Sequence, residues 1–318
     1  MKKIEKVTLI GLGAMGVFFA PKLDAYLGKK NFRILAEGER KSRIESQGVT
    51  VNGTNHRFTV ITPQLQDDPA DLIIIAVKDT GLSQAIQDIR NQVGEQTQIL
   101  CVMNGIDSEE KIAAVYGWKQ VLYSYMRVSI VMEDGVANFD PSFGKVHFGE
   151  AKNEELSERV NYIKDLFEVC EISYNIDADM IKGLWFKYMC NIGENMTCAL
   201  LGVPFGAYHV SDHANEIRRS MMWEVVKIAN QLGIALGQED IDLQEKTIKR
   251  LPPFNKPSTF QDLEKNRKTE VEMFSGKIVK LGLELGIETP LNWLVYHGIC
   301  VLEEKNKKDW MEKKDVAY

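Results

Sequence analysis

A glycine-rich turn near the N-terminus constrains the fold more than any other feature of the sequence. Residues 6–10 form a short apolar run that predicts a strand, and the turn GLGAMG follows directly at positions 11–16. Gly11 permits a tight turn, Gly13 lets the backbone approach a pyrophosphate, and Gly16 lets a helix pack closely on the strand. The free N–H groups of the following helix then face the phosphates. The turn therefore predicts dinucleotide binding by Gly11, Leu12, Gly13, Ala14, Met15 and Gly16.

The first half of the chain alternates strand and helix patterns. A short apolar run at 32–36 predicts a strand. The β-branched run at 71–77, like the similar run at 99–103, predicts a strand buried on both faces, and further strands are expected at 121–131 and 145–148. Between them, apolar residues such as Leu82, Ala85, Ile86 and Ile89 recur at helical spacing. The alternation predicts an α/β domain of the Rossmann type with a mainly parallel sheet.

The second half has a different character. After a short strand expected at 170–174, helical patterns predict helices at 179–200, 215–232, 259–286 and 291–305, with no convincing strand. We therefore expect two domains: a dinucleotide-binding domain over residues 1–176 and an all-α domain over residues 177–318.

Composition excludes several other classes of protein. The chain has 318 residues, and its 45 acidic and 39 Lys and Arg side chains leave a net charge of −6, which argues against a nucleic-acid partner. No apolar run reaches about 18 residues, so we expect neither a membrane partner nor a targeting segment. Five widely spaced cysteines form no CxxC pair, and five histidines show no metal or triad spacing. We expect a cytoplasmic protein with reduced thiols and no metal.

The end of the second strand bears on which nicotinamide cofactor binds. Glu37 stands where a carboxylate suits the free ribose hydroxyls of NAD and repels the 2′-phosphate of NADP. Arg40, Lys41 and Arg43 follow immediately and carry the charge that would hold this phosphate, although a solvated helix start is the alternative for Lys41. The charges alone leave NAD and NADP open.

Two polar residues follow buried strands of the predicted sheet. Lys78 ends the strand at 71–77, and Asn104 follows the strand at 99–103. Doubly wound sheets place ligands at the carboxyl ends of their strands, so both residues are candidate cofactor contacts. The alternative for Asn104, which precedes Gly105, is a generic turn.

A polar stripe runs along an otherwise apolar helix in the second half. Lys187, Asn191 and Asn195 are spaced at i, i+4 and i+8, which places them on one helical face. Polar groups on a buried helix need partners or a function, and a partly desolvated lysine can act as a general acid at a carbonyl oxygen. Capping asparagines with a snorkelling lysine are the alternative. Gly193 would be explained by the close approach of another backbone.

These features together resemble the ketopantoate reductase (2-dehydropantoate 2-reductase) family. The resemblance rests on the glycine turn, Lys78, the Met-Asn-Gly at 103–105, the Trp-x-Lys-x-x-x-Asn-x-x-x-Asn at 185–195, and the block from Ser258 through Gln261-Asp262 to Thr269-Glu270 and Gly276. The resemblance covers nearly the whole chain. The Lys-x-x-x-Asn element is shared by a wider group of hydroxyacid dehydrogenases, and the block at 258–276 distinguishes the ketopantoate reductase family within that group. The resemblance implies an N-terminal Rossmann domain, a helical C-terminal domain like that of 6-phosphogluconate dehydrogenase, and a cleft between them.

The resemblance also implies roles for individual residues. Lys187 matches the catalytic general acid, and Glu270 matches the carboxylate that accompanies it. Without the resemblance, Ser258 is equally well explained as a helix cap, and Glu270 can be a solvated residue within a helix. Two departures stand out: members often carry Arg at the position of Glu37, and some carry Asn at the position of Phe205. The implied substrate contacts are Asn191, Asn195, Ser258 and Asn104, and the implied cofactor contacts outside the glycine turn are Glu37, Arg40, Lys78 and Asn104.

The implied activity is NAD(P)H-dependent reduction of 2-dehydropantoate to pantoate on the route to pantothenate and coenzyme A. Family resemblance places NADPH ahead of NADH, although Glu37 keeps NADH as an alternative. A reductase of another small 2- or 3-keto acid and a non-catalytic nucleotide-sensing module are the alternative functions. The expected partner is a small 2-keto acid, and a homodimer stays open because the sequence gives no oligomeric state.

Overall fold

The computed structural model describes residues 3–66, 69–140 and 144–307 of the chain. The chain divides into two compact units, Met1–Leu184 and Trp185–Tyr318. The division falls inside helix α6 (Met180–Cys190), which lies C-terminal to the domain boundary predicted at 176/177.

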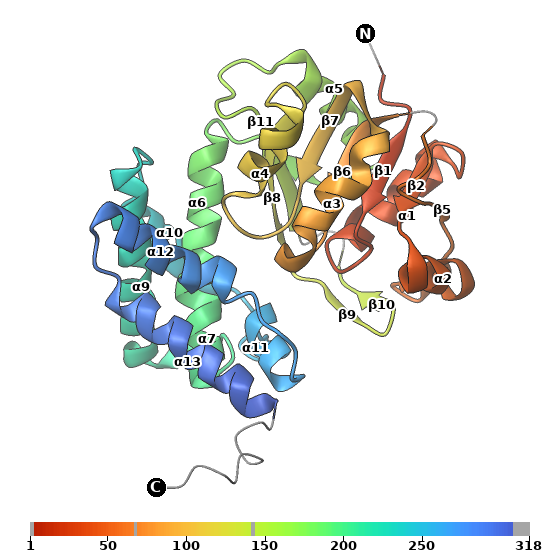
Figure 1. Ribbon diagram of the computed structural model, residues 1–318. Coiled ribbons are helices and arrows are strands. Elements are labelled where there is room, and N and C mark those ends of the chain that lie inside the picture. Colours follow the sequence, from red (N-terminus) through yellow and green to blue (C-terminus); the bar gives the residue numbers. More distant parts are fainter. Residues whose placement is uncertain (1–2, 67–68, 141–143, 308–318) are drawn as a thin grey trace, which may run out of the picture. The chain divides into compact units, whose positions relative to one another are not determined.

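The first unit is built on an eight-stranded sheet with the strand order β12-β11-β8-β7-β6-β1-β2-β5 (Figure 1). Every neighbouring pair is parallel except β8 with β11, which confirms the prediction of a mainly parallel α/β unit. The strands are β1 (Val7–Ile10), β2 (Phe32–Leu35), β5 (Thr59–Ile61), β6 (Ala70–Ile75), β7 (Val93–Cys101), β8 (Val121–Val128), β11 (Gly144–Gly149) and β12 (Tyr174–Asn175).

Helices cover both faces of this sheet. On one face α1 (Gly16–Leu27) and α5 (Glu158–Val169) share a core, in which Phe19 and Phe167 contact alternate strand residues such as Leu72 and Ile74. The intervening residues Ile73 and Ile75 are also fully buried, and Figure 1 shows α3 (Leu82–Asp88) and α4 (Ser108–Tyr116) in front of the sheet. Burial on two faces explains why these strands are continuously apolar. Helix α2 (Gly38–Gln47) follows β2.

A second, four-stranded sheet of order β4-β3-β10-β9 accompanies the large one. It consists of β3 (Val49–Val51), β4 (Thr54–His56), β9 (Val131–Glu133) and β10 (Val136–Asn138), and β10 lies parallel to β3. The strand expected at 121–131 is therefore too long, because β8 ends at Val128 and Val131 already belongs to β9. The turn between β9 and β10 carries Asp134 and Gly135, both with positive φ.

The second unit is helical, as predicted. It contains the end of α6, the two π-helical segments η3 (Asn191–Met196) and η4 (Glu272–Gly276), and α-helices of very different lengths. The α-helices are α7 (Thr197–Leu201), α8 (Ala207–Val210), α9 (Asp212–Gln231), α10 (Gln238–Ile248), α11 (Ser258–Glu264), α12 (Lys277–Leu285) and α13 (Pro290–Asn306).

Two further expected elements are wrong in extent. The helix expected over 259–286 is broken, because Asn266 adopts φ +52°, a left-handed conformation that ends α11. Glu270 accordingly lies in an irregular segment before η4 and not in the middle of a helix. The strand expected at 170–174 shrinks to β12, because Glu171 has φ +54° and the chain turns at the end of α5.

The structure also bears on the cysteines and on membrane insertion. All five cysteines are free, and four of them are buried while Cys300 is partly exposed. Within residues 3–66, 69–140 and 144–307, none of the helices combines the length and the apolar character needed to cross a bilayer.

Candidate functional site

The glycine turn has the geometry that nucleotide binding requires. Gly11 has φ +97°, and a Cβ there would lie 2.5 Å from the Ala76 carbonyl oxygen; a Cβ at Gly16 would lie 2.0 Å from the Gly11 carbonyl oxygen. Both positions therefore exclude a side chain. At Gly13, by contrast, no described atom lies within 4 Å of an added Cβ. The open space at Gly13 leaves the backbone accessible at the N-terminus of α1, as in the glycine turns of Rossmann units.

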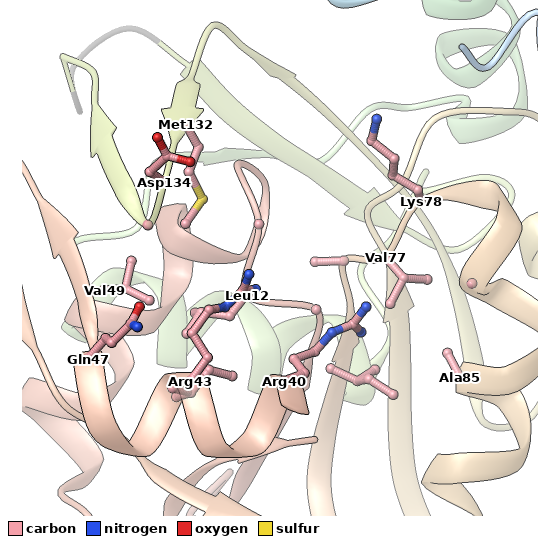
Figure 2. A pocket seen from close by; sticks show the side chains of 18 of the residues that line it. Leu12, Arg40, Arg43, Gln47, Val49, Val77, Lys78, Ala85, Met132 and Asp134 are labelled. Atoms are coloured by element: carbon pink, nitrogen blue, oxygen red, sulfur yellow. The ribbon is translucent and has the colours of Figure 1, made fainter. Parts of the chain in front are cut away.

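The turn opens onto a cavity of about 640 Å³ within the first unit. Its walls come from the ends of β1 and β6, from α2, from α3 and from the turn between β9 and β10 (Figure 2). The volume is within the range of cofactor pockets, roughly 300–1,000 Å³. The residues that line it and were predicted as cofactor contacts are Gly11, Leu12, Gly13, Arg40 and Lys78.

Two arginines of α2 reach into this cavity. Arg40 and Arg43 are one helical turn apart, and Figure 2 shows both guanidinium groups extending from α2 toward the glycine turn. Lys41 instead forms an ion pair with Glu45 at 3.4 Å. Glu37 precedes α2, is exposed, and accepts a hydrogen bond from Gln64 at 3.2 Å; it is not among the residues that line the cavity. The cavity therefore presents two guanidinium groups at the end of β2.

Lys78 and Asn104 follow neighbouring parallel strands. Lys78 comes after β6, and its side chain in Figure 2 turns away from Arg40 and Arg43. Asn104 comes after β7 and is half-buried, beside Gly105 with φ +109°. Both residues thus lie at the carboxyl edge of the sheet, like the glycine turn after β1, as expected for a doubly wound sheet.

A buried carboxyl group supports the helix that follows Asn104. Glu109 in α4 is 1% exposed, and its two oxygens accept hydrogen bonds from the Ser108 hydroxyl at 2.8 Å and from the Ser124 amide at 3.2 Å. Burial raises the pKa of Glu109 to about 7, against the opposing effect of these hydrogen bonds. A group that titrates near neutral pH therefore lies five residues after Asn104.

In the second unit, Lys187 occupies the last turn of the apolar helix α6. Its side chain is buried, with 9% of the residue exposed, and its neighbours Leu184 and Tyr188 are fully or almost fully buried. A largely desolvated ammonium group of this kind is suited to a short-range electrostatic or proton-transfer role.

Asn191 and Asn195 lie in the π-helical segment η3, directly after α6. The Nδ2 atom of Asn195 donates a hydrogen bond to Oδ1 of Asn191 at 3.3 Å, and both residues are half-buried. In a regular α-helix, residues four apart drift by about 40° around the axis, since one turn takes 3.6 residues. The wider π-turn counteracts this drift and aligns the two amides. Such π-turns occur frequently at functional sites.

Gly193 permits the close approach that the sequence suggested. A Cβ at this position would lie 2.6 Å from Cγ of Met222 and 3.0 Å from the carbonyl oxygen of Arg218, both in α9. Helix α9 therefore packs directly against the backbone of η3. The glycine at this position is therefore required by helix packing.

Ser258 and Glu270 lie in segments close to η3. Ser258 is exposed and is the first residue of α11, whose N-cap is Pro257, so the hydroxyl is not the helix cap. Helix α11 and segment η4 both contact η3, and half-buried Glu270 lies two residues before η4. The elements that carry Asn191, Asn195, Ser258 and Glu270 are thus neighbours within the helical unit.

Several cavity residues escaped the sequence reasoning. Gln47 extends the stripe of Arg40 and Arg43 along α2, and this helical spacing could have identified it. Met132 in β9 and Asp134 in the turn after it line the cavity, and no sequence motif marks them. Among the described residues, no group of three or more His, Cys, Asp and Glu side chains is arranged to hold a metal ion.

Comparison with known proteins gives consistent results along the chain. Residues 7–153 match the family described as Ketopantoate reductase PanE/ApbA, and residues 179–303 match Ketopantoate reductase PanE/ApbA C terminal. The 2-dehydropantoate 2-reductase of Aquifex aeolicus (strain VF5) is 28% identical over 315 residues, covering 96% of this chain and 99% of the relative.

Solved structures show the same fold. D-mandelate dehydrogenase, solved with NADH and anilino(oxo)acetate, superposes with a TM-score of 0.85 at 21% identity and covers 95% of this chain and 99% of its own. A dimeric ketopantoate reductase from Staphylococcus aureus superposes with a TM-score of 0.78 at 20% identity, with the same coverage of both chains.

The nucleotide-binding turn, the parallel sheet and the helical unit define a Rossmann-type oxidoreductase that uses a nicotinamide dinucleotide. Within this class, the two matched regions together span most of the sequence. The chain belongs to the ketopantoate reductase family.

Proposed function

We propose that the protein reduces 2-dehydropantoate to pantoate with NADPH. The observation that carries the proposal is the cluster in the helical unit: buried Lys187 at the end of α6, the paired amides of Asn191 and Asn195 in η3, and Ser258 and Glu270 on elements next to η3. A cationic donor beside several hydrogen-bonding groups suits a small, charged keto acid.

Lys187 acts as the general acid. Its ammonium group donates a proton to the oxygen that becomes the hydroxyl of the product, and its charge stabilises the negative charge that develops there. Asn191, Asn195 and Ser258 orient the substrate through hydrogen bonds. Glu270 accompanies Lys187 as the second catalytic group. When bound, the nicotinamide supplies the hydride to the keto carbon.

Arg40 and Arg43 favour NADPH over NADH. Both line the cavity at the end of β2, where the 2′-position of the adenosine ribose is bound in Rossmann units, and planar guanidinium groups suit a phosphate. Glu37, the reason to consider NADH, forms a hydrogen bond with Gln64 outside the cavity lining. Lys78 and the glycine turn would hold the cofactor's remaining groups.

Initial rates with a panel of keto acids test the proposal. The panel contains 2-dehydropantoate, a small aliphatic 2-keto acid and phenylglyoxylate, each with NADPH and with NADH. We expect the highest kcat/KM for 2-dehydropantoate with NADPH. The aromatic acid is included because Phe205 replaces an asparagine found in some family members, and because the D-mandelate dehydrogenase relative was solved with an aromatic ligand.

We further propose a homodimer, as in the dimeric relative from Staphylococcus aureus. Exposed apolar side chains on α12 and α13, namely Leu283, Trp293 and Leu294, offer a surface of the kind that oligomers bury. Sedimentation analysis at micromolar concentration measures the mass directly.

A further inference from the structure

The segment that carries Glu270 is held by a distant residue: the carboxylate of Glu303, more than 30 residues further along the chain, forms hydrogen bonds with it. Glu303, near the C-terminal end of α13, is 7% exposed. Its Oε1 atom accepts hydrogen bonds from the Thr269 amide at 2.9 Å and from the Thr269 hydroxyl at 2.5 Å. Its Oε2 atom accepts one from Lys268 Nζ at 2.7 Å. Burying a charged carboxylate costs free energy unless hydrogen-bond donors or an opposite charge pair with it. Because these three donors pair with Glu303, its carboxylate is held in one position.

The same contacts reach both sides of Glu270. The Thr269 hydroxyl, held by Glu303, also accepts a hydrogen bond from the Val271 amide at 3.3 Å. Residues 269 and 271 are therefore tied to one carboxylate, with Glu270 between them. Burial opposes ionisation of Glu303, yet the hydrogen bonds from Lys268 and Thr269 lower its pKa, so it carries its charge at neutral pH.

A second anchor comes from the helix of Lys187. The hydroxyl of Tyr188, the next residue, lies 2.5 Å from the Met273 carbonyl oxygen and 2.9 Å from that of Phe274. Both carbonyls belong to η4, whose π-helical hydrogen bonds leave some backbone groups in need of partners. The Phe274 amide in turn donates to the Glu270 carbonyl oxygen at 3.1 Å.

We propose that Glu303 is a positioning residue for Glu270, with Tyr188 as the second anchor. Glu270 lies in the irregular segment between α11 and η4, whose helix-type backbone hydrogen bonds are confined to its two ends, at Lys265 and at Glu270 and Val271. The carboxylate of Glu303 adds hydrogen bonds to Lys268 and Thr269 between these ends, and Tyr188 connects η4 to the helix that bears Lys187. The inference rests on the proposed function, because Glu270 has a catalytic role only if the protein is a keto-acid reductase.

Three substitutions separate this role from general stability. Glu303→Leu removes the acceptor for Thr269, Glu303→Gln keeps one acceptor oxygen without the charge, and Lys268→Met removes only the ion pair. Misplacing a catalytic group by about 1 Å can cost about 100-fold in rate. We therefore expect Glu303→Leu to lower kcat by about 10- to 100-fold while the KM for the cofactor stays unchanged. Glu303→Gln and Lys268→Met should keep kcat within about threefold of the wild type.

A matched control is Asp71→Leu. Asp71 also accepts two backbone amides, those of Glu5 and Lys6 at 3.0 Å each, but at the amino end of β6. It should lower the melting temperature without lowering kcat. If Glu303→Leu does not fold, Thr269→Val provides the milder test, because it removes only the hydroxyl that links Glu303 to Val271. Tyr188→Phe should give a smaller loss of kcat than Glu303→Leu.

Amide hydrogen exchange distinguishes failure of this inference from failure of the proposed function. Exchange across residues 268–276 should be faster in Glu303→Leu than in Glu303→Gln, whatever the substrate is. A folded Glu303→Leu enzyme with wild-type kcat, or equal losses in the Leu and Gln variants, overturns the positioning role. A wild-type protein that reduces no keto acid overturns the proposed function instead, and the exchange rates then decide whether Glu303 orders the segment.

Discussion

On the proposed preference for NADPH, replacing Arg40 and Arg43 with alanine should leave an enzyme that no longer distinguishes NADPH from NADH well. The only chemical difference between NADPH and NADH is the 2′-phosphate, so any interaction with that group enters directly into the ratio of the two kcat/KM values. Both guanidinium groups point into the cavity beside the glycine turn, whereas the neighbouring Lys41 is paired with Glu45 (Figure 2).

The size of the effect follows from the exposure of the two side chains. Arg40 and Arg43 are exposed, and an ordinary exposed ion pair contributes about 0–1 kcal/mol. Charge-assisted hydrogen bonds to a phosphate contribute more, about 1.5–3 kcal/mol. We take the lower end, about 1.5 kcal/mol, which corresponds to a roughly tenfold loss of NADPH preference for each substitution. The two residues would share one phosphate, so the double variant should lose less than the product of the single losses.

The assay is a comparison of initial rates with NADPH and NADH at saturating keto acid, at low and at high salt. Salt should reduce the wild-type preference, because exposed charge interactions are screened. Arg57→Ala is the control: Arg57 is an exposed arginine that donates to the Glu45 carbonyl oxygen at 2.8 Å and does not line the cavity. If the double variant keeps the wild-type ratio of the two kcat/KM values, or if Arg57→Ala changes that ratio equally, then Arg40 and Arg43 do not bind the 2′-phosphate.

Three further predictions concern the acid, the packing of η3 and pH. Lys187→Ala should lower kcat by about 10²–10⁴-fold with unchanged circular dichroism, and a variant that keeps more than about a third of the rate would exclude Lys187 as the acid. Gly193→Ala, normally favourable in a helix by about 1 kcal/mol, should instead destabilise by about 1–3 kcal/mol in urea titrations, because its Cβ would lie 2.6 Å from Met222. Glu109 has its pKa raised to about 7 in the folded state, against 4.5 as the ordinary value, so the native protein binds more protons between these values and stability falls as pH rises through them. Glu109→Gln should abolish this contribution, about 2–3 kcal/mol at most, in denaturation curves at pH 5 and pH 8; equal pH slopes in both proteins would contradict it.

The sequence predicts best what periodicity and burial determine. Strands such as β6 are buried on both faces and therefore carry a continuous apolar run, and the glycines of the turn are required by backbone contacts that admit no side chain. The helical unit follows from its 3.6-residue period. These features depend on residues that are close in the sequence, so the sequence predicts them.

The remaining features depend on contacts between distant residues. The three-residue strands of the small sheet are defined by pairing, such as Val136 with Thr50, and not by their own composition. The π-turn at 191–196 is one extra residue in a helix, which leaves the apolar pattern nearly unchanged. The break before Glu270 depends on Asn266 and on Glu303, more than 30 residues further along, so the helical pattern over 259–286 conceals it.

Residues of β9 and of the β9–β10 turn line the cavity beside the glycine turn, and this has a consequence for the order in which the first unit folds. Met132 and Asp134 complete a wall opposite α2, yet more than a hundred residues separate them from the glycine turn. During synthesis, the early strand–turn–helix segment therefore forms before this wall of the cavity exists. A ligand that needs the complete cavity can favour the native state by mass action only after β10 has paired with β3. Cofactor depletion should accordingly leave early folding untouched and shorten the lifetime of the finished unit.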